Sequence, residues 1–337
     1  MRNQACAPAA RGRLGSLGKE AARYSLLLLL ALIVLFFSLL DPRFFTAKNI
    51  LDILRTASII GLMAVGGVMI MISGEINFAI GSQVTLAATL IGKMMTVLPP
   101  VMYVPAILAT TALIMVTGLA AGWIVTRFEV PAFLATFVLQ MFLNGFIKLM
   151  TGNVTFYSEK WTGSYTFLGQ TMLFNVIPLP LVLFIAVAAG SHIFLEHSKI
   201  GRYLFAVGAN ATASRQVGIR VDRIKIWGFV IGAAYAALAG IVLTSLFSDV
   251  QLNMGTELQT PAIAATVLSA AFYTVGKYNI PGAVVASILT VVIQNGVVTA
   301  GGEYFYKDIV QGVFLTAAIA IIAMIREEGL PKVNFTR

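Results

Sequence analysis

Residues 201–219 read GRYLFAVGANATASRQVGI and form a polar, basic stretch between two strongly apolar segments. Asn210 is a favourable helix N-cap, and residues 211–217 can form two short helical turns. Gly218 can adopt the left-handed conformation that ends them. Basic loops between apolar segments are retained on the cytoplasmic side of a membrane. We therefore expect a small cytoplasmic helix held between segments that cross the membrane.

The amino-acid composition excludes a soluble globular protein. Of the 337 residues, 58% are hydrophobic and 11% are charged, whereas soluble domains carry about 25% charged residues. The net charge of +9 does not indicate nucleic-acid binding, because the basic residues fall in short blocks and form no basic face with interleaved aromatic residues. The single cysteine, Cys6, excludes an internal disulfide and a cysteine-rich metal site. The sequence predicts an integral membrane protein without a cofactor.

The hydropathy pattern predicts an all-α membrane protein with about ten transmembrane helices, some interrupted by glycine or proline. A membrane helix needs about 20 mostly apolar residues. The first apolar stretch is followed by Asp41-Pro42-Arg43 without a small-residue cleavage pattern, so we interpret it as a membrane helix and not as a signal peptide. The predicted spans are Tyr24–Leu40, Ile50–Ile72, Ile80–Met95, Val104–Val125, Pro131–Met150, Leu179–Leu195, Ile226–Phe247, Leu258–Val275, Pro281–Val298 and Phe305–Ile325.

The positions of lysine and arginine predict the orientation of a single transmembrane domain that covers residues 1–337. Basic residues in 1–23 and in 326–337 predict two cytoplasmic tails, which an even number of spans satisfies. The same topology leaves residues 196–225 in the cytoplasm and the polar, aromatic residues 151–175 outside. The basic residues that hold the first of these loops inside are Arg202, Arg215, Arg220, Arg223 and Lys225.

A polar interruption separates the second and third predicted spans. Residues 74–82 read GEINFAIGS and place Glu75 and Asn77 in an apolar setting. Ionisable residues inside a membrane usually face the bundle interior or a water-filled path. A comparable interruption at residues 276–282 lies in the second half, and paired broken segments point to a transport path. Two interpretations remain: the segment, including Ser82, lines the passage, or it lies at the cytoplasmic interface with Glu75 solvated.

Two amides near the C-terminus are further candidates for the path. Gln294 and Asn295 lie inside an apolar span and could hydrogen-bond a polar solute. Amides between membrane helices also hold a bundle together. Both roles remain open.

The stretch 201–219 closely resembles the coupling loop of ribose-type sugar ABC importer permeases. The family pattern is Gly-Arg-Tyr, then Ala-x-Gly-x-Asn, then Ala-Ala, then Gly-Ile, and this sequence has Ser214 in place of the second alanine. The interruption also resembles the family motif Gly-Gly-Ile-Asp-Leu-Ser-Val-Gly-Ser, with Glu75 for a glycine and Asn77 for the aspartate. The resemblance extends over residues 45–325.

The resemblance implies a transport subunit that works by alternating access. Its implied partners are separate ABC ATPase subunits, an extracytoplasmic sugar-binding protein, a second permease copy or a related permease, and membrane lipid. The chain has no Gly-x-x-x-x-Gly-Lys-Ser/Thr phosphate loop, so we expect no ATP hydrolysis by this chain and no enzymatic activity. The residues expected to couple to the ATPase are Gly201, Arg202, Gly208, Asn210, Ala213, Ser214, Arg215, Gly218 and Ile219. Those expected along the path are Glu75, Asn77, Ser82, Gln294 and Asn295.

Three other functions remain as alternatives. An ion-coupled secondary transporter needs buried ionisable groups, for which Glu75 is the strongest intramembrane candidate. An ABC permease for another solute, such as a branched-chain amino acid or a nucleoside, would differ only in the lining of its path. A membrane enzyme lacks a recognisable constellation, since the sequence has no His-Glu-x-x-His or Gly-x-Ser-x-Gly pattern and only His192 and His197 as imidazoles.

Overall fold

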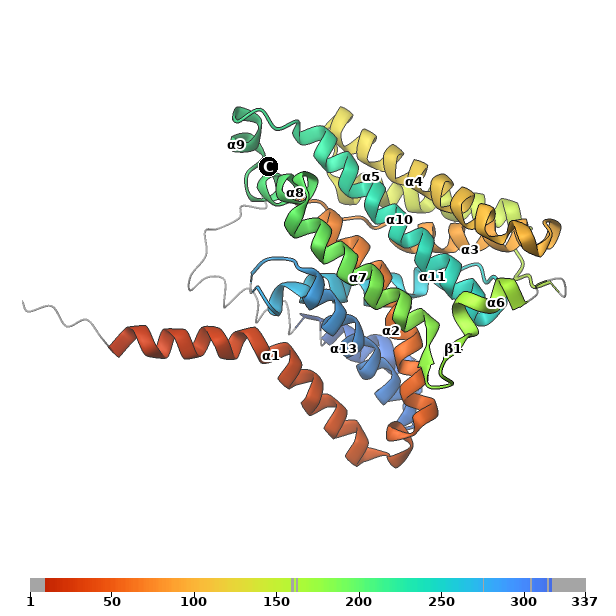
Figure 1. Cartoon of the computed structure of the whole chain (residues 1–337), viewed down its shortest axis with the longest axis horizontal. Helices are drawn as coiled ribbons and strands as arrows, with labels where there is room; N and C mark the ends of the chain where they lie inside the picture. Colours follow the sequence, from red (N-terminus) through yellow and green to blue (C-terminus); the bar gives the residue numbers. More distant parts are fainter. Residues whose placement is uncertain are drawn as a thin grey trace, which may run out of the picture.

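The computed structural model describes residues 10–316 apart from residues 159, 160, 162, 275, 304 and 314, and it is a bundle of long helices (Figure 1). Its longer helices are α1 (Ala10–Leu40), α2 (Ala47–Met71), α3 (Ile80–Val97), α4 (Tyr103–Phe128), α5 (Ala132–Thr151), α7 (Leu179–His197), α10 (Val221–Phe247) and α13 (Ile280–Thr299). Its shorter ones are α6 (Gly163–Gln170), α8 (Lys199–Ala209), α9 (Ala211–Gln216), α11 (Met254–Glu257) and α12 (Gln259–Leu268), with 3-10 turns η1 (Pro42–Phe45), η2 (Pro100–Met102) and η3 (Ser269–Ala271). A small antiparallel hairpin joins β1 (Met172–Leu173) to β2 (Ile177–Pro178), with Met172 opposite Pro178. The predicted all-α membrane class is confirmed.

Among the described residues, six helices are long and apolar enough to cross a membrane, and each matches a predicted span. They are Ala47–Met71, Pro100–Phe128, Ala132–Thr151, Leu179–His197, Val221–Phe247 and Ile280–Thr299. The predicted spans at 24–40 and 80–95 are also helical, within α1 and α3. Of the last predicted span, residues 305–313 are helical, and its part beyond residue 316 lies outside the described residues, as does the predicted tail 326–337.

Proline and cap residues set several helix starts where the sequence predicted them. Pro131 immediately precedes α5, and α13 begins with Asn279 as N-cap and Pro281 in its first turn. The Asn279 side chain accepts a hydrogen bond from the Gly282 amide at 2.7 Å. These residues satisfy or remove backbone donors that a helix start leaves unpaired.

The predicted span Leu258–Val275 is wrong as a single helix. α12 ends at Leu268 and has 10 residues, about 15 Å, which is too short to cross a bilayer. Pro261 in its first turn favours a helix start there. Proline has no backbone N–H to donate to the carbonyl four residues earlier, and its ring would clash with that carbonyl in a helix interior. The chain passes from Ser248 through the single turn of α11 into α12, so this part of the bundle is a discontinuous helical segment.

The centre of the bundle is formed by α2 and α10. Of the apolar window of α2, 78% is buried, against 17% for that of α5, which lies on the outside beside α4. α2 and α10 approach closely because Gly66 faces Gly232, where a side chain on either would meet the other helix. Short helices cover one end of this core, and a short helix with the β-hairpin covers the other.

One end of the bundle, which we call the basic end, carries Arg202, Arg215, Arg220, Arg223 and Lys225. It holds α8 and α9, whereas α6 and the β-hairpin lie at the opposite end (Figure 1). At the opposite end the Ser245 hydroxyl donates to the Tyr165 carbonyl at 2.7 Å and accepts from the Gly169 amide at 2.8 Å, which fixes α6 on α10. An antiparallel bridge between Phe156 and Val250 joins the chain after α5 to the chain after α10.

Candidate coupling surface and transport path

The small helix predicted after Asn210 is confirmed as α9. The Asn210 side chain accepts a hydrogen bond from the Ala213 amide at 2.9 Å, as expected of an N-cap. Gly218 follows the helix with a positive φ of 84°, the left-handed conformation predicted for it. The stretch before Asn210, interpreted as a loop, is instead the helix α8. Its buried residues, Gly201, Leu204 and Val207, recur every third position and form one apolar face.

The glycines of α8 lie against other parts of the same chain. A methyl group on Gly208 would overlap the carbonyl oxygen of Ile72, at the end of α2. A methyl group on Gly201 would overlap the Leu195 carbonyl oxygen in α7. The two predicted coupling glycines therefore serve close packing inside this chain, and Gly208 places α8 directly on the interruption between α2 and α3.

α9 presents small residues to the outside. Ala213 and Gly218 are exposed, and Val217 between them is 76% exposed. Ser214, which stands in place of the family's second alanine, faces inward at 4% exposure. Val217 was missed by the sequence analysis, although an apolar residue beside a helix-ending glycine is a detectable signal.

Three further predicted coupling residues stabilise the local structure. Arg215 forms an ion pair with Asp222 at 2.8 Å, in which both side chains are exposed and the contribution to stability is small. Arg202 donates to the His197 carbonyl at 3.0 Å. The Ile219 amide donates to the Ser214 carbonyl at 3.0 Å and closes the turn after α9. α10 begins at Val221, earlier than the predicted Ile226, because the helix includes the charged residues Asp222, Arg223 and Lys225 that precede the apolar span.

We call residues 72–79, between α2 and α3, the first break, and its centre is Asn77. The side chain of Asn77 is buried, accepts from the Ala79 amide at 2.8 Å and donates to Gln83 Oε1 at 3.0 Å. Gln83 in turn donates to the Thr117 hydroxyl of α4 at 3.0 Å and is fully buried. Asn77 thus turns the chain into α3 in the way that asparagine side chains stabilise turns. Gln83 was missed, although it is the strongest polar residue of its apolar span.

Glu75 lies at the basic end, where the second sequence interpretation placed it, but it is paired. Its carboxylate accepts a hydrogen bond from the Lys225 ammonium at 2.5 Å, and the two side chains are 15% and 23% exposed. Lys225 belongs to the first turns of α10, which follow α9. The ion pair therefore connects the first break to the chain that leaves α9. Ser82 is buried inside the bundle and donates to the Ala79 carbonyl at 3.1 Å.

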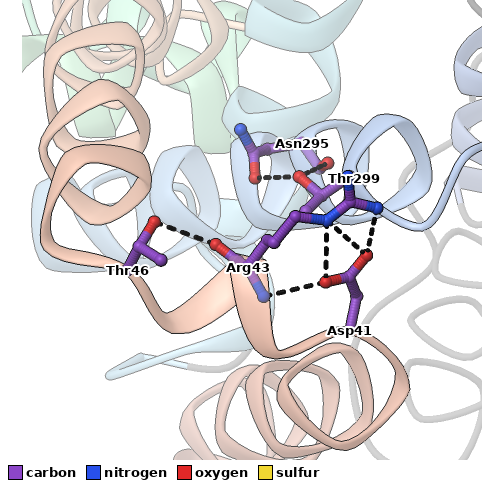
Figure 2. Close-up of polar contacts among 5 residues, drawn as sticks. All are labelled: Asp41, Arg43, Thr46, Asn295 and Thr299. Carbon is purple, nitrogen blue, oxygen red and sulfur yellow. Dashed lines mark hydrogen bonds and ion pairs between the residues drawn. The ribbon is translucent and has the colours of Figure 1, made fainter.

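Gln294 and Asn295 bind neighbouring helices at the opposite end and do not meet Asn77. The Gln294 amide donates to Gln311 Oε1, and the Asn295 amide donates to Asn49 Oδ1 at 2.9 Å, near the start of α2. Figure 2 shows Asn295 beside Thr299, whose hydroxyl donates to the Asn295 carbonyl at 2.9 Å. In the same view Asp41 and Arg43 are paired in η1. These partners favour the interpretation that the two amides hold the bundle together.

Residues 248–258, between α10 and α12, form what we call the second break. It comes before the interruption predicted at residues 276–282, which begins in the non-helical stretch before α13. The Gly255 amide donates to the Thr85 hydroxyl of α3 at 3.1 Å. At the first residue of α12, the Gln259 amide donates to Gln140 Oε1 of α5 at 3.3 Å. Glu257 and Thr260 beside it are exposed.

The comparisons with known proteins agree on the class of this chain. Residues 49–319 match the family described as "Branched-chain amino acid transport system / permease component". The chain is 31% identical to the ribose import permease protein RbsC of Escherichia coli K12 over 309 residues, 88% of this chain and 92% of that protein. It is 28% identical to RbsC of Bacillus subtilis, over 87% and 90% of the two chains. It is also 28% identical to the autoinducer 2 import system permease protein LsrC of Yersinia pseudotuberculosis, over 88% and 84%. No solved structure matches this chain.

Proposed function

The chain belongs to the permease family described as branched-chain amino acid transport system / permease component, and we propose that it is the permease subunit of an ABC importer for a sugar. The solute class follows its relatives, which include ribose and autoinducer 2 import permeases. A ribose-like monosaccharide is the proposed solute. The geometric observation that supports the proposal best is α9 at the basic end. It is capped by Asn210, exposed at Ala213 and followed by the exposed Val217 and the left-handed Gly218.

We place the basic end in the cytoplasm of a bacterial cell, with the chain in the inner membrane as one domain of about ten crossings. The blocks of lysine and arginine at this end resist translocation. In this topology the discontinuous passage from Ser248 to Ala271 is one crossing, and both termini are cytoplasmic. The opposite end, with α6 and the hairpin, then faces outward, where an extracytoplasmic sugar-binding protein delivers the solute.

The proposed energy source is a pair of separate ATPase subunits that bind α9. A helix of 6 residues is not stable alone in water, so α9 depends on packing against α8 and a partner. Movement of α9 reaches the first break through two contacts, Gly208 on Ile72 and Lys225 on Glu75. A second permease copy or a related permease completes the transporter.

The proposed path includes Glu75, Asn77 and Ser82. They belong to the first break and the start of α3, which we propose change position during transport. Gln294 and Asn295 contribute at the opposite end by holding α13 against its neighbours. Solute binding by itself shifts a conformational equilibrium only by its differential affinity for the two states, so uphill import requires the ATPase.

A second candidate function, an ion-coupled secondary transporter, is favoured by one observation. Glu257 is an exposed carboxylate in the second break, between two segments of the bundle. Ion coupling in membranes uses such groups. The second candidate would need no ATPase.

Uptake into proteoliposomes separates the two candidates. The chain is reconstituted with the ATPase and the binding protein encoded beside it, and uptake of radiolabelled D-ribose is measured with and without ATP. We expect uptake that requires ATP and all three proteins and that is insensitive to collapse of proton and sodium gradients. Uptake by the chain alone, driven by an ion gradient, would establish the secondary transporter instead.

A further inference from the structure

The second break lies deep inside the bundle. α10 has 27 residues and is about 40 Å long. Gly240, about two turns before the outward end of α10, packs on the Val84 carbonyl of α3. One turn further inward, Gly255 and Gly81 pack backbone against backbone, and the Gly255 amide bonds to Thr85. The second break therefore reaches the depth of the hydrocarbon region.

Two polar side chains at the junction of the second break with α12 are not enclosed by the chain. Glu257 and Thr260 are exposed, and Gln259 is half-buried against Gln140 of α5. Irregular backbone at this depth occurs only where protein buries it or where it lines water. A carboxylate facing lipid at this depth is costly, so such residues face a bundle interior or an aqueous path.

One side-chain oxygen at the start of α12 is a hydrogen-bond acceptor without a donor. Gln259 Oε1 is buried and has no hydrogen-bond partner among the described residues. A buried acceptor without a donor is unfavourable. Glu257, two residues before Gln259, adds a carboxylate with two acceptor oxygens. The Thr260 hydroxyl, about one helical turn after Glu257, both donates and accepts. The segment thus offers several acceptors to a group that carries O–H donors.

We infer that Glu257, Gln259 and Thr260, with Gln140 of α5, line the aqueous solute path at mid-membrane and bind the hydroxyl groups of a neutral, hydroxyl-rich solute. This inference rests on the proposed function for the solute class, but the lining of the path by these residues stands on the geometry alone. Polar groups that fix the orientation of a ligand in an otherwise apolar passage are how small-molecule sites obtain specificity. Gln259 and Gln140 come from different helices, so the site changes when α5 moves against α12.

Thiol accessibility tests the lining without any transport assay. In a Cys6→Ser background of the full chain, Glu257→Cys and Thr260→Cys are each treated with a charged, membrane-impermeant maleimide, in right-side-out and in inverted membrane vesicles. Ile185→Cys, an exposed apolar position on the membrane-spanning helix α7, is the matched control, which we expect to face lipid. A thiol reacts as its thiolate, which forms in water and not in hydrocarbon, so we expect the two path positions to label at least about tenfold faster than the control from one side or the other. Labelling of both path positions as slow as that of Ile185→Cys, from both sides, would overturn the inference.

Uptake of radiolabelled D-ribose by the complete transporter tests the binding role. We expect Glu257→Leu to lower uptake about tenfold while Glu257→Gln, which keeps an acceptor oxygen, lowers it less. Co-purification of the ATPase should be unchanged in both. Parental uptake by Glu257→Leu would overturn the binding role. If the parent itself imports no D-ribose, the proposed solute fails, and the accessibility result alone then decides whether these residues line the path.

Discussion

The two breaks of the bundle differ in how their polar groups are satisfied. Asn77 of the first break forms a closed chain of hydrogen bonds with Gln83 of α3 and Thr117 of α4, and Glu75 is paired with Lys225. At the second break Glu257 remains exposed, as does Thr260 in the first turn of α12. A closed polar network rigidifies a segment, whereas open polar groups at membrane depth need water or a ligand. The difference indicates that the first break transmits movement of α8 into the bundle and that the second break lines the path.

The largest effect on uptake is expected from a methyl group added where α8 packs on the first break. Gly208→Ala places a Cβ on the Ile72 carbonyl oxygen, and overlap of this kind costs on the order of 1–3 kcal/mol. We expect uptake to fall about tenfold or more, since each 1.4 kcal/mol lost from the productive state is a factor of ten. The measurement is uptake in proteoliposomes normalised to inserted protein.

Gly145→Ala is the control for that substitution. Gly145 lies on α5, and no described atom lies within 4 Å of a methyl group placed there. Alanine is also the better helix former at an exposed position, so this variant should insert and transport like the parent. Equal uptake by the two variants would show that contact of α8 with the first break is unimportant.

Charge removal should affect the two breaks to different degrees. Glu75→Leu leaves Lys225 partly buried without its partner, and we expect about a threefold loss of uptake, smaller than that of Glu257→Leu. The double variant Glu75→Leu/Lys225→Met should regain part of the loss, because it removes both charges. No recovery would mean that Glu75 acts in the path itself and that the two breaks do not differ as we propose.

Asn77 should contribute to stability more than to transport. Asn77→Leu removes two hydrogen bonds and should lower the free energy of unfolding by about 1–2 kcal/mol. Asn77→Asp keeps the acceptor for the Ala79 amide, and the Gln83 amide can turn to donate to it. Thermal unfolding in detergent should therefore rank the parent and Asn77→Asp above Asn77→Leu. Reduced uptake by Asn77→Asp at a parental melting temperature would assign the residue a direct role in the path.

The smallest effect is expected at the opposite end, away from both breaks. Hydrogen bonds from Arg43 lower the pKa of Asp41 below its ordinary value. A lowered carboxyl pKa contributes stability that is fully present above the unfolded-state pKa of about 4 and is lost as pH falls through the folded pKa. Asp41→Asn should thus lower the melting temperature slightly and equally at pH 6 and pH 8. A difference between the two pH values would show that another group titrates with this pair.

The sequence predicted features that depend on local chemistry. Asn210 as a cap, Gly218 as a left-handed stop and Pro131 before α5 each act within one helical turn, so their residue types suffice. Features that depend on contacts between distant segments were missed. Hydropathy cannot separate a continuous span at 258–275 from a short α12. The chain turns after Leu268, where the side chain of the distant Asn279 donates to the Ser269 carbonyl at 2.9 Å.

The same limit applies to the candidate site. The residues around Gln83 come from the first break and α4, and Gln140 meets Gln259 only after α5 packs beside α12. Gln294 and Asn295 looked equally suited to a path, but their partners are other helices at the opposite end. Glu257 was visible as a charge beside an apolar span, and only its depth in the bundle makes it a candidate.

The coupling ratio of two α9 variants tests the proposed function most directly. Ala213 on α9 and Gly218 just after it are exposed, so Ala213→Trp and Gly218→Val should leave the bundle folded and inserted. Valine at the left-handed Gly218 also strains the turn that ends α9. In proteoliposomes with the ATPase and the binding protein, we predict that both variants bind less ATPase and hydrolyse more ATP per D-ribose imported than the parent. Unchanged coupling in both variants, with parental ATPase binding, would contradict an ABC permease that is driven through α9.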